Sequence, residues 1–255
     1  MLKSLFQILN MLALIATIII NYLSNTGIFN GETMATMSAK FQNLFTPAGY
    51  AFSIWGLIYL GLLGFVIYYG PFTKNTDAKE KTIQKVGWWF VISCIANSLW
   101  VFAWLYGCTF LTIPIMAILF FSLMKIIMNN QDVMQNPDLK TNIFLRLPFY
   151  IYSGWISVAI IADVAAYLKK IQWSGFGISE TTWTVLMLAV AAIIHLYMIW
   201  KLNMTTFALA AVWAAIAIAV ANQYSNQTVY VAAVTTAILI FGNVSVQMLK
   251  RRTFL

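Results

Sequence analysis

Two side chains that can gain or lose a proton lie in otherwise apolar sequence. Asp163 stands in the run SVAIIADVAAYL, and His195, the single histidine, stands in AAIIHLYMIW. An ionisable group in such a segment is costly unless it faces the protein interior and has a partner. A carboxyl–imidazole pair would satisfy both side chains and would provide a proton relay or a polar handle for a ligand. The alternative for His195 is a neutral imidazole bonded to a backbone carbonyl, and the sequence leaves both open.

Aromatic and polar side chains recur at helical spacing in three apolar segments. Side chains three or four residues apart share one face of a helix. The three series are Phe52, Trp55 and Tyr59; Asn97, Trp100 and Trp104; and Trp155, Ala159 and Asp163. Each series alone is typical of core packing or of an aromatic belt at the membrane interface. Together they predict the walls of a pocket for a flat, hydrophobic ligand.

The other residues argue against most enzyme classes. A single histidine cannot build a metal site with several histidine ligands, and the sequence contains neither a convincing Ser-His-Asp arrangement nor a glycine-rich phosphate loop. The late apolar segments also lack a lysine deep enough to form a retinal Schiff base. Enzymatic activity stays uncertain, and we expect a protein that is not an enzyme, with no metal and no required cofactor.

Composition indicates that lipid surrounds these segments. Of the 255 residues, 62% are hydrophobic and 9% are charged, whereas a soluble domain carries about 25% charged residues. The apolar runs approach about 20 residues, the length that crosses a hydrocarbon core. We predict an all-α polytopic membrane helix bundle with spans near 5–23, 48–70, 86–107, 109–129, 144–168, 182–200, 203–221 and 228–248. The segment 86–129 is divided at Cys108 because it is too long for one crossing.

The net charge of +8 predicts membrane orientation and no nucleic-acid binding, since the basic residues are dispersed along the loops and one tail. With the N-terminus inside, all Lys and Arg residues fall in inner segments except Lys40, Lys169 and Lys170. This asymmetry predicts that both termini are cytoplasmic, with a bacterial inner membrane as the default. The N-terminal apolar run is long and lacks a cleavage pattern, so we expect a retained first helix.

Three further segments carry expectations of their own. Cys94 and Cys108 stand in apolar sequence without a CxxC spacing, which predicts two small buried side chains. The connection 24–47 is long, mostly polar and ends at Pro47, which is typical of a functional cover or of a disordered loop. The last three spans are rich in Ala, Val and Ile, which predicts close helix packing.

The motifs share their order and spacing with a known family. Pro47 precedes the second span, with Trp55 eight residues later and Tyr59 four residues after that. The third span carries Asn97-x-x-Trp100, and the fifth opens with Pro148-Phe149 before the Trp155 series. On these motifs the chain resembles the TspO/MBR family, the tryptophan-rich sensory proteins and the mitochondrial translocator protein. It departs from the family pattern by Pro47-Ala48 in place of Pro-Pro, a displaced Phe52, a longer interval before Trp155, and Asp163 in place of Asn.

The resemblance implies a five-helix bundle with a pocket beneath the first loop that binds porphyrins, haem-like tetrapyrroles or sterols. It covers residues 1–168, and 169–255 is expected to be an additional three-helix transmembrane region. The expected ligand-binding residues are Pro47, Phe52, Trp55, Tyr59, Asn97, Trp100, Trp104, Trp155, Ala159 and Asp163, with His195 as a proton or ligand handle.

The expected function is therefore binding of a hydrophobic planar ligand for sensing, regulation or transport. The expected partners are the lipid bilayer and that small molecule, with a homodimer left open. Two alternatives remain open. One is a proton-coupled secondary transporter that uses Asp163 and His195, and the other is a porphyrin-degrading enzyme.

Overall fold

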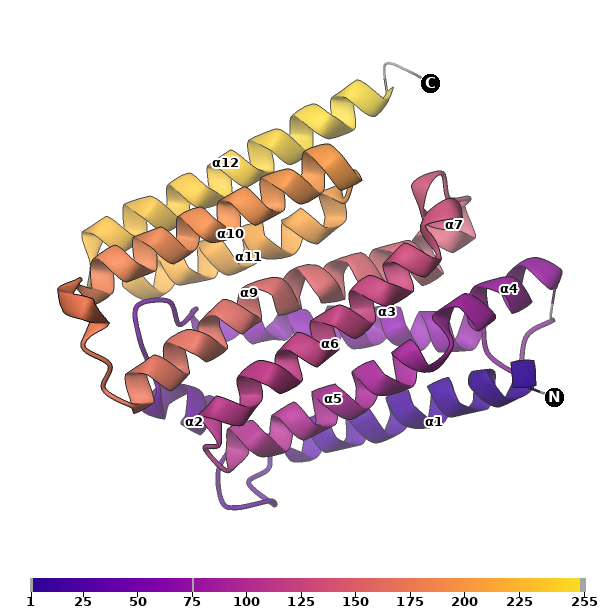
Figure 1. The fold of residues 1–255 in the computed structure, drawn as a ribbon, viewed down its shortest axis with the longest axis horizontal. Coiled ribbons are helices and arrows are strands. Elements are labelled where there is room, and N and C mark those ends of the chain that lie inside the picture. Colours follow the sequence, from indigo (N-terminus) through magenta and orange to yellow (C-terminus); the bar gives the residue numbers. More distant parts are fainter. Residues whose placement is uncertain (1, 75, 253–255) are drawn as a thin grey trace. The chain divides into compact units, whose positions relative to one another are not determined.

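The computed structural model describes residues 2–74 and 76–252, and this part of the chain is helical without strands (Figure 1). It contains eight helices long and apolar enough to cross a membrane, which confirms the predicted polytopic bundle. The spans are Leu5–Leu23, Gly49–Tyr68, Trp88–Leu105, Thr109–Asn129, Leu139–Lys170, Glu180–Leu202, Thr205–Asn222 and Gln227–Lys250. The side chains of Lys3, Arg251 and Arg252, which the predicted orientation uses, lie outside the described part.

The predicted division at Cys108 is confirmed by a tight turn between two helices. Helix α5 (Trp88–Leu105) ends before Gly107, whose φ of 68° is a left-handed conformation that glycine adopts without a Cβ penalty. The Gly107 amide donates to the carbonyl of Trp104 at 2.9 Å, and helix α6 (Thr109–Asn129) begins two residues later. Cys94 is buried, as predicted, but the prediction of burial is wrong for Cys108, which is exposed at this turn.

The chain forms two compact units. The N-terminal unit comprises Met1–Met37 and Ile54–Ser153, and the C-terminal unit comprises Ser38–Ser53 and Gly154–Leu255. The boundary falls within one continuous helix, α9 (Leu147–Lys170). These units divide the chain at other places than the predicted five-helix core and three-helix addition, and that division stays a prediction.

In the N-terminal unit, helix α1 (Leu2–Leu23) packs against α5 and against α3 (Ile54–Tyr68), and α5 packs against α6 (Figure 1). Aromatic rings fill the core where α3, α5 and α9 meet. The centroid of Phe65 lies 5.3 Å from that of Phe90 and 5.1 Å from that of Phe149, and all three side chains are buried. The Phe65–Phe149 pair is edge-to-face and the Phe65–Phe90 pair is tilted, and aromatic pairs at this spacing stabilise the core beyond their apolar burial.

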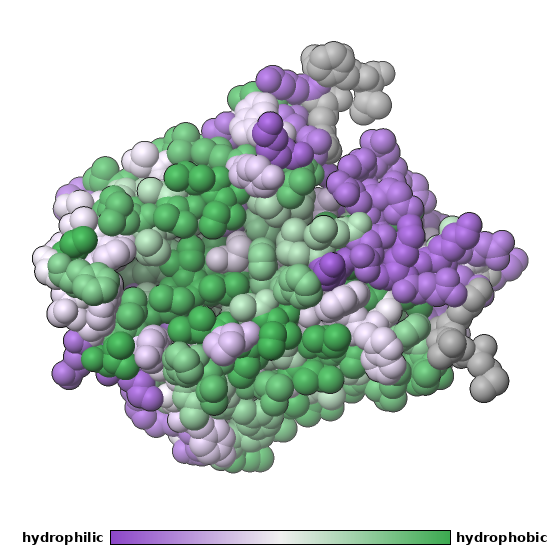
Figure 2. All heavy atoms as spheres, viewed as in Figure 1, coloured by the Kyte–Doolittle hydropathy of each residue, from purple (hydrophilic) through white to green (hydrophobic). Residues whose placement is uncertain are grey.

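The remaining elements of this unit are short. Helix α4 (Asp77–Val86) begins at Thr76, whose hydroxyl accepts a hydrogen bond from the Lys79 amide as an N-cap. Helices α7 (Gln131–Gln135) and α8 (Leu139–Thr141) lead into a π-helical turn, η2 (Asn142–Arg146), before α9. Figure 2 shows hydrophilic side chains gathered over α4 and α7, whereas apolar side chains cover the flanks of α5 and α6. Apolar flanks with polar ends are typical of helices that cross a bilayer.

In the C-terminal unit, helices α10 (Glu180–Leu202), α11 (Thr205–Asn222) and α12 (Gln227–Arg252) lie side by side (Figure 1). Helix α11 buries a run of alanines, and small side chains let neighbouring backbones approach in a membrane. A Cβ placed on Gly154 of α9 would lie 2.2 Å from the carbonyl oxygen of Phe207. This close approach of α9 to α11 agrees with the predicted packing role of the last spans.

The first connection is more ordered than a simple loop. It contains helix α2 (Met34–Lys40) and a 3₁₀ turn, η1 (Gly49–Ser53), immediately before α3. Its later part lies against α11, where the Ala48 amide donates to the carbonyl of Ala217 and the Trp213 indole donates to the carbonyl of Ala51, both at 3.0 Å. The segment 38–53 is therefore anchored on α11, a helix that lies much later in the sequence.

Candidate functional site

The centre of the N-terminal unit holds a fully buried amide. Asn97 of α5 has no exposed surface, and its Nδ2 donates to the hydroxyl of Tyr152 at 2.9 Å. Its Oδ1 accepts a hydrogen bond from Nδ2 of Asn21 at 2.7 Å. Buried polar groups need such partners because an unpaired one loses its hydration without compensation. The amide therefore links α1, α5 and the first turns of α9 through side chains alone.

Three further polar contacts extend this link along α1. Asn21 also donates to the carbonyl of Thr17 at 3.0 Å, and the Thr17 hydroxyl lies 3.2 Å from the carbonyl of Cys94 and 3.4 Å from the Ser98 hydroxyl. The polar side chains of α1 and α5 thus face each other over more than one helical turn. Such side-chain bonds between helices stabilise membrane bundles and fix the rotation of each helix.

Aromatic rings border this polar centre. Trp55 stacks on Tyr59 with centroids 5.6 Å apart and packs edge-on against Tyr152 at 5.7 Å. The hydroxyl of Tyr59 is buried and makes no hydrogen bond of good geometry in the described part of the chain, although the Asn97 side chain lies close to it. A buried hydroxyl without a partner is rare and calls for a ligand, a water or stored strain as its explanation. The site therefore combines an aromatic wall with spare hydrogen-bonding capacity.

The two tryptophans of the predicted α5 series lie against each other. Trp100 and Trp104 are buried and stack nearly parallel, with centroids 5.9 Å apart and an interplanar angle of 15°. They lie one helical turn apart, so the stack follows from their spacing in the sequence.

The sequence predicted that Phe52 shares a helix face with Trp55 and Tyr59, and this prediction is wrong. Helix α3 begins at Ile54, and Phe52 lies in the preceding 3₁₀ turn, where the residues per turn and the side-chain directions differ. Its ring packs edge-on against Trp155 in the C-terminal unit, with centroids 6.3 Å apart. Pro47 lies nearby in sequence, in the segment anchored on α11.

The two titratable groups of the C-terminal unit have different surroundings. Asp163 and Trp155 are both buried on α9, and Ala159 lies half-buried between them in sequence. His195 is buried on α10, where Nδ1 donates to the carbonyl of Ala191 at 2.7 Å and Nε2 lies 3.2 Å from the hydroxyl of Ser157. Both ring nitrogens of the imidazole thus have hydrogen-bond partners, a backbone carbonyl and the Ser157 hydroxyl.

Neither of these His195 contacts is made with Asp163, the partner that the sequence prediction considered. Ser157 and Asp163 are six residues apart, about 9 Å along the helix axis and on different faces. The alternative that the sequence left open, an imidazole bonded to a backbone carbonyl, describes His195 in this structure.

Comparison with known families adds to this geometry. A family model described as TSPO-like protein matches residues 7–246. The chain belongs to the TSPO-like family. The match continues well past residue 168 and takes in α10, α11 and most of α12, so the expectation that the resemblance ends with the fifth span is wrong. Searches of curated proteins and of solved structures gave no match.

The predicted site residues of this TSPO-like protein fall in two groups. The N-terminal unit contains Trp55, Tyr59, Asn97, Trp100 and Trp104, and the C-terminal unit contains Pro47, Phe52, Trp155, Ala159, Asp163 and His195. The sequence prediction omitted Tyr152, Asn21 and Thr17. Their signals were present, because Tyr152 lies three residues before Trp155, and Thr17 and Asn21 are polar residues four apart in the first span.

Proposed function

We propose that this TSPO-like integral membrane protein binds a flat, hydrophobic small molecule, such as a porphyrin, a haem-like tetrapyrrole or a sterol, for sensing, regulation or transport. The observation that supports it best is the buried Tyr59 hydroxyl, which makes no hydrogen bond of good geometry in the described part of the chain, on a ring that stacks against Trp55. Trp55 in turn packs on Tyr152, whose hydroxyl is bonded to Asn97. Together they offer a ligand a π-face and a hydrogen-bonding group.

The energetics favour a ligand of this kind. An aromatic pair contributes about 0.5–1.5 kcal/mol beyond the burial of apolar area. An unsatisfied buried hydroxyl costs about 1–3 kcal/mol, which a ligand acceptor or donor can recover. A planar molecule with polar substituents at its edge would gain both terms, whereas a plain hydrocarbon would gain only the first.

The test is to titrate the protein in lipid nanodiscs with protoporphyrin IX and to follow the absorbance of the porphyrin itself. Tyr59→Phe removes only the hydroxyl, and we expect weaker binding by up to about tenfold. The same variant should keep or raise the thermal stability, because it removes an unsatisfied polar atom. Tyr197→Phe on α10, where the side chain is exposed, is the matched control and should bind as the unchanged protein does.

A binding curve that is the same in Tyr59→Phe would contradict the role of the hydroxyl. Unchanged binding in Trp100→Ala combined with Trp155→Ala would overturn the wider pocket assignment, since each residue is an aromatic member of one predicted wall.

A second candidate function, proton-coupled transport, is favoured by one observation: Asp163 is a carboxylate buried within a membrane span. Such residues commonly mark ion or proton pathways. This proposal predicts ligand-dependent proton uptake into liposomes that is lost in Asp163→Asn. Full proton movement in that variant would assign Asp163 the place of the family's Asn and no proton-coupling role.

A further inference from the structure

The C-terminal unit contains a cavity that none of the predicted site residues lines. Its volume is about 720 Å³, within the range of about 300–1,000 Å³ that small-molecule sites occupy. Its walls come from the second half of α9, the connection 172–178, the start of α10, and the segment 43–45 of the first connection. The cavity therefore depends on α10, which lies outside a five-helix core.

The lining changes from apolar to polar along α9. Ile160 and Ile161 line one part of the cavity, and Lys169 lines it nine residues later, about 13 Å along the helix. Met187 of α10 adds to the apolar part, and Gln172 and Glu180 add to the polar part. Lys169 lies at the end of its span, so the polar part is at the membrane boundary and the apolar part reaches toward the bilayer interior. This gradient matches an amphipathic molecule aligned with the lipids.

Two tryptophans form an aromatic wall at the polar end. The rings of Trp173 and Trp183 have centroids 5.3 Å apart. The Trp183 indole donates to the carbonyl of Gly175 at 2.9 Å, and Gly175 has a φ of 67°. A Cβ at Gly175 would lie 3.3 Å from the Trp183 ring nitrogen, so glycine leaves the space that the indole occupies. A hydrogen bond thus fixes one ring of the wall and the second ring packs on it, which favours a flat ring system over a flexible chain.

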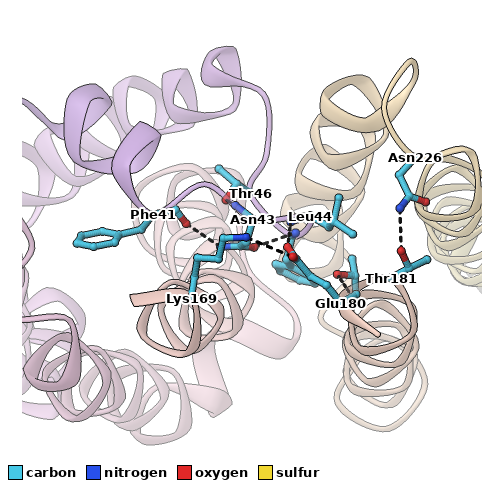
Figure 3. A network of polar contacts seen from close by, with 10 residues as sticks. Phe41, Asn43, Leu44, Thr46, Lys169, Glu180, Thr181 and Asn226 are labelled. Carbon is cyan, nitrogen blue, oxygen red and sulfur yellow. Dashed lines mark hydrogen bonds and ion pairs between the residues drawn. The ribbon is translucent and has the colours of Figure 1, made fainter. Parts of the chain in front are cut away.

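A polar network fastens the first connection to α9 and α10 (Figure 3). Oε1 of Glu180 accepts a hydrogen bond from the Leu44 amide at 2.9 Å, and Oε2 lies 3.3 Å from Nζ of Lys169. The Leu44 carbonyl accepts a hydrogen bond from Asn222 at 3.0 Å. Among the described residues that line the cavity, Glu180 is the one acidic and Lys169 the one basic side chain, and the two neutralise each other. A ligand with a neutral hydrogen-bonding end suits this rim better than an ion.

From these features we infer that the cavity between α9 and α10 binds an amphipathic ligand with a planar apolar body and one neutral, hydrogen-bonding end. The apolar body lies along α9 beside the tryptophans, and the polar end reaches Lys169 and Gln172. This site is separate from the one proposed above, because it shares no lining residue with the predicted set.

The probe for the test is 1-pyrenebutanol, which has a planar body and a hydroxyl end. Its binding is measured by equilibrium dialysis against nanodiscs with and without the protein, so that partition into lipid is subtracted. The full-length protein should show saturable binding. Ala165→Trp fills the cavity and should weaken binding at least about tenfold. The matched control Ile193→Trp places the same ring on an exposed position of α10 and should change the affinity less than twofold.

Three results would overturn the inference. They are the absence of saturable binding, equal affinities for Ala165→Trp and the unchanged protein, and displacement of the probe by hexadecanol at equal concentration, which would assign the cavity to an acyl chain. If Ala165→Trp does not fold, Trp173→Leu removes one ring of the wall and must weaken binding instead. Protoporphyrin binding should be unchanged in Ala165→Trp, so this inference and the proposed function fail separately.

Discussion

Asn97 Nδ2 lies 2.9 Å from the hydroxyl of Tyr152, and this bond joins two spans that are more than fifty residues apart in sequence. The amide is bonded at its other end to Asn21, so loss of one partner leaves a polar group buried with part of its capacity unused. This bond sets the rotation of α5 and of the first turns of α9 about their own axes. It therefore decides which side chains face the polar centre of the N-terminal unit.

The first prediction concerns this bond. Tyr152→Phe removes the acceptor of Asn97, and we expect a loss of about 1–3 kcal/mol in the free energy of unfolding because the amide stays buried. Thermal unfolding in detergent gives the change. A double-mutant cycle with Asn97→Ala should show coupling of about 0.5–3 kcal/mol, and additive effects would contradict a direct interaction.

The second prediction concerns the approach of α9 to α11. Gly154→Ala places a methyl group 2.2 Å from the Phe207 carbonyl oxygen, so the helices must separate, at a cost of about 1–3 kcal/mol. The matched control is Gly242→Ala on α12, which meets no atom within 4 Å. That control should be neutral or slightly stabilising, because alanine favours helix by up to about 1 kcal/mol over glycine. Equal melting temperatures for the two variants would contradict the close approach.

The third prediction concerns pH. The hydrogen bond from Lys85 holds the pKa of Asp132 below its usual range. A lowered pKa in the folded state stabilises the fold above the unfolded pKa of about 3.9, and this contribution is lost as the pH falls through the lower folded value. Both side chains are partly exposed, so we expect less than about 1 kcal/mol.

Melting curves from pH 6 to pH 3 should therefore show a slightly weaker acid dependence in Asp132→Asn than in the unchanged protein. High salt should reduce the difference, since screening weakens an exposed pair. The same acid dependence in Asp132→Asn and the unchanged protein at low salt would show that the pair contributes nothing measurable.

The fourth prediction tests the orientation in the membrane. Cys108 is exposed at the turn between α5 and α6, whereas Cys94 is buried. With both termini inside, this turn faces outward, and a membrane-impermeant maleimide should label intact cells at Cys108. Cys108→Ser should abolish labelling. Lys74→Cys in that background should react only after permeabilisation, and the reverse pattern would invert the orientation.

The sequence predicted the helices well because membrane spans are encoded locally. A run of apolar residues long enough to cross the bilayer needs no knowledge of its neighbours, so the predicted spans agree with the observed ones to within a few residues, apart from the start of the fifth. The pairs Trp55–Tyr59 and Trp100–Trp104 were predictable for the same reason, since each lies one turn apart on one helix.

Contacts between distant segments were not predictable in this way. The bond from Asn97 to Tyr152 depends on how α5 and α9 rotate toward each other, which spacing within one helix does not determine. Phe52 was misplaced because a 3₁₀ turn and an apolar helix have similar composition here. The cavity beside Trp173 and Trp183 depends on a left-handed glycine and on Glu180 bonding to Leu44, neither of which leaves a motif in the sequence.

The anchoring of the first connection on α11 limits how this chain can be shortened. A protein cut after residue 168 would keep the five spans of the expected core but would lose the Ala217 carbonyl, the Trp213 indole and the Asn222 amide that hold residues 44–51. Its first connection would then have lost its supporting surface. The last three helices therefore include the surface on which the first connection packs. The protein cannot be shortened to its first five spans without removing that surface.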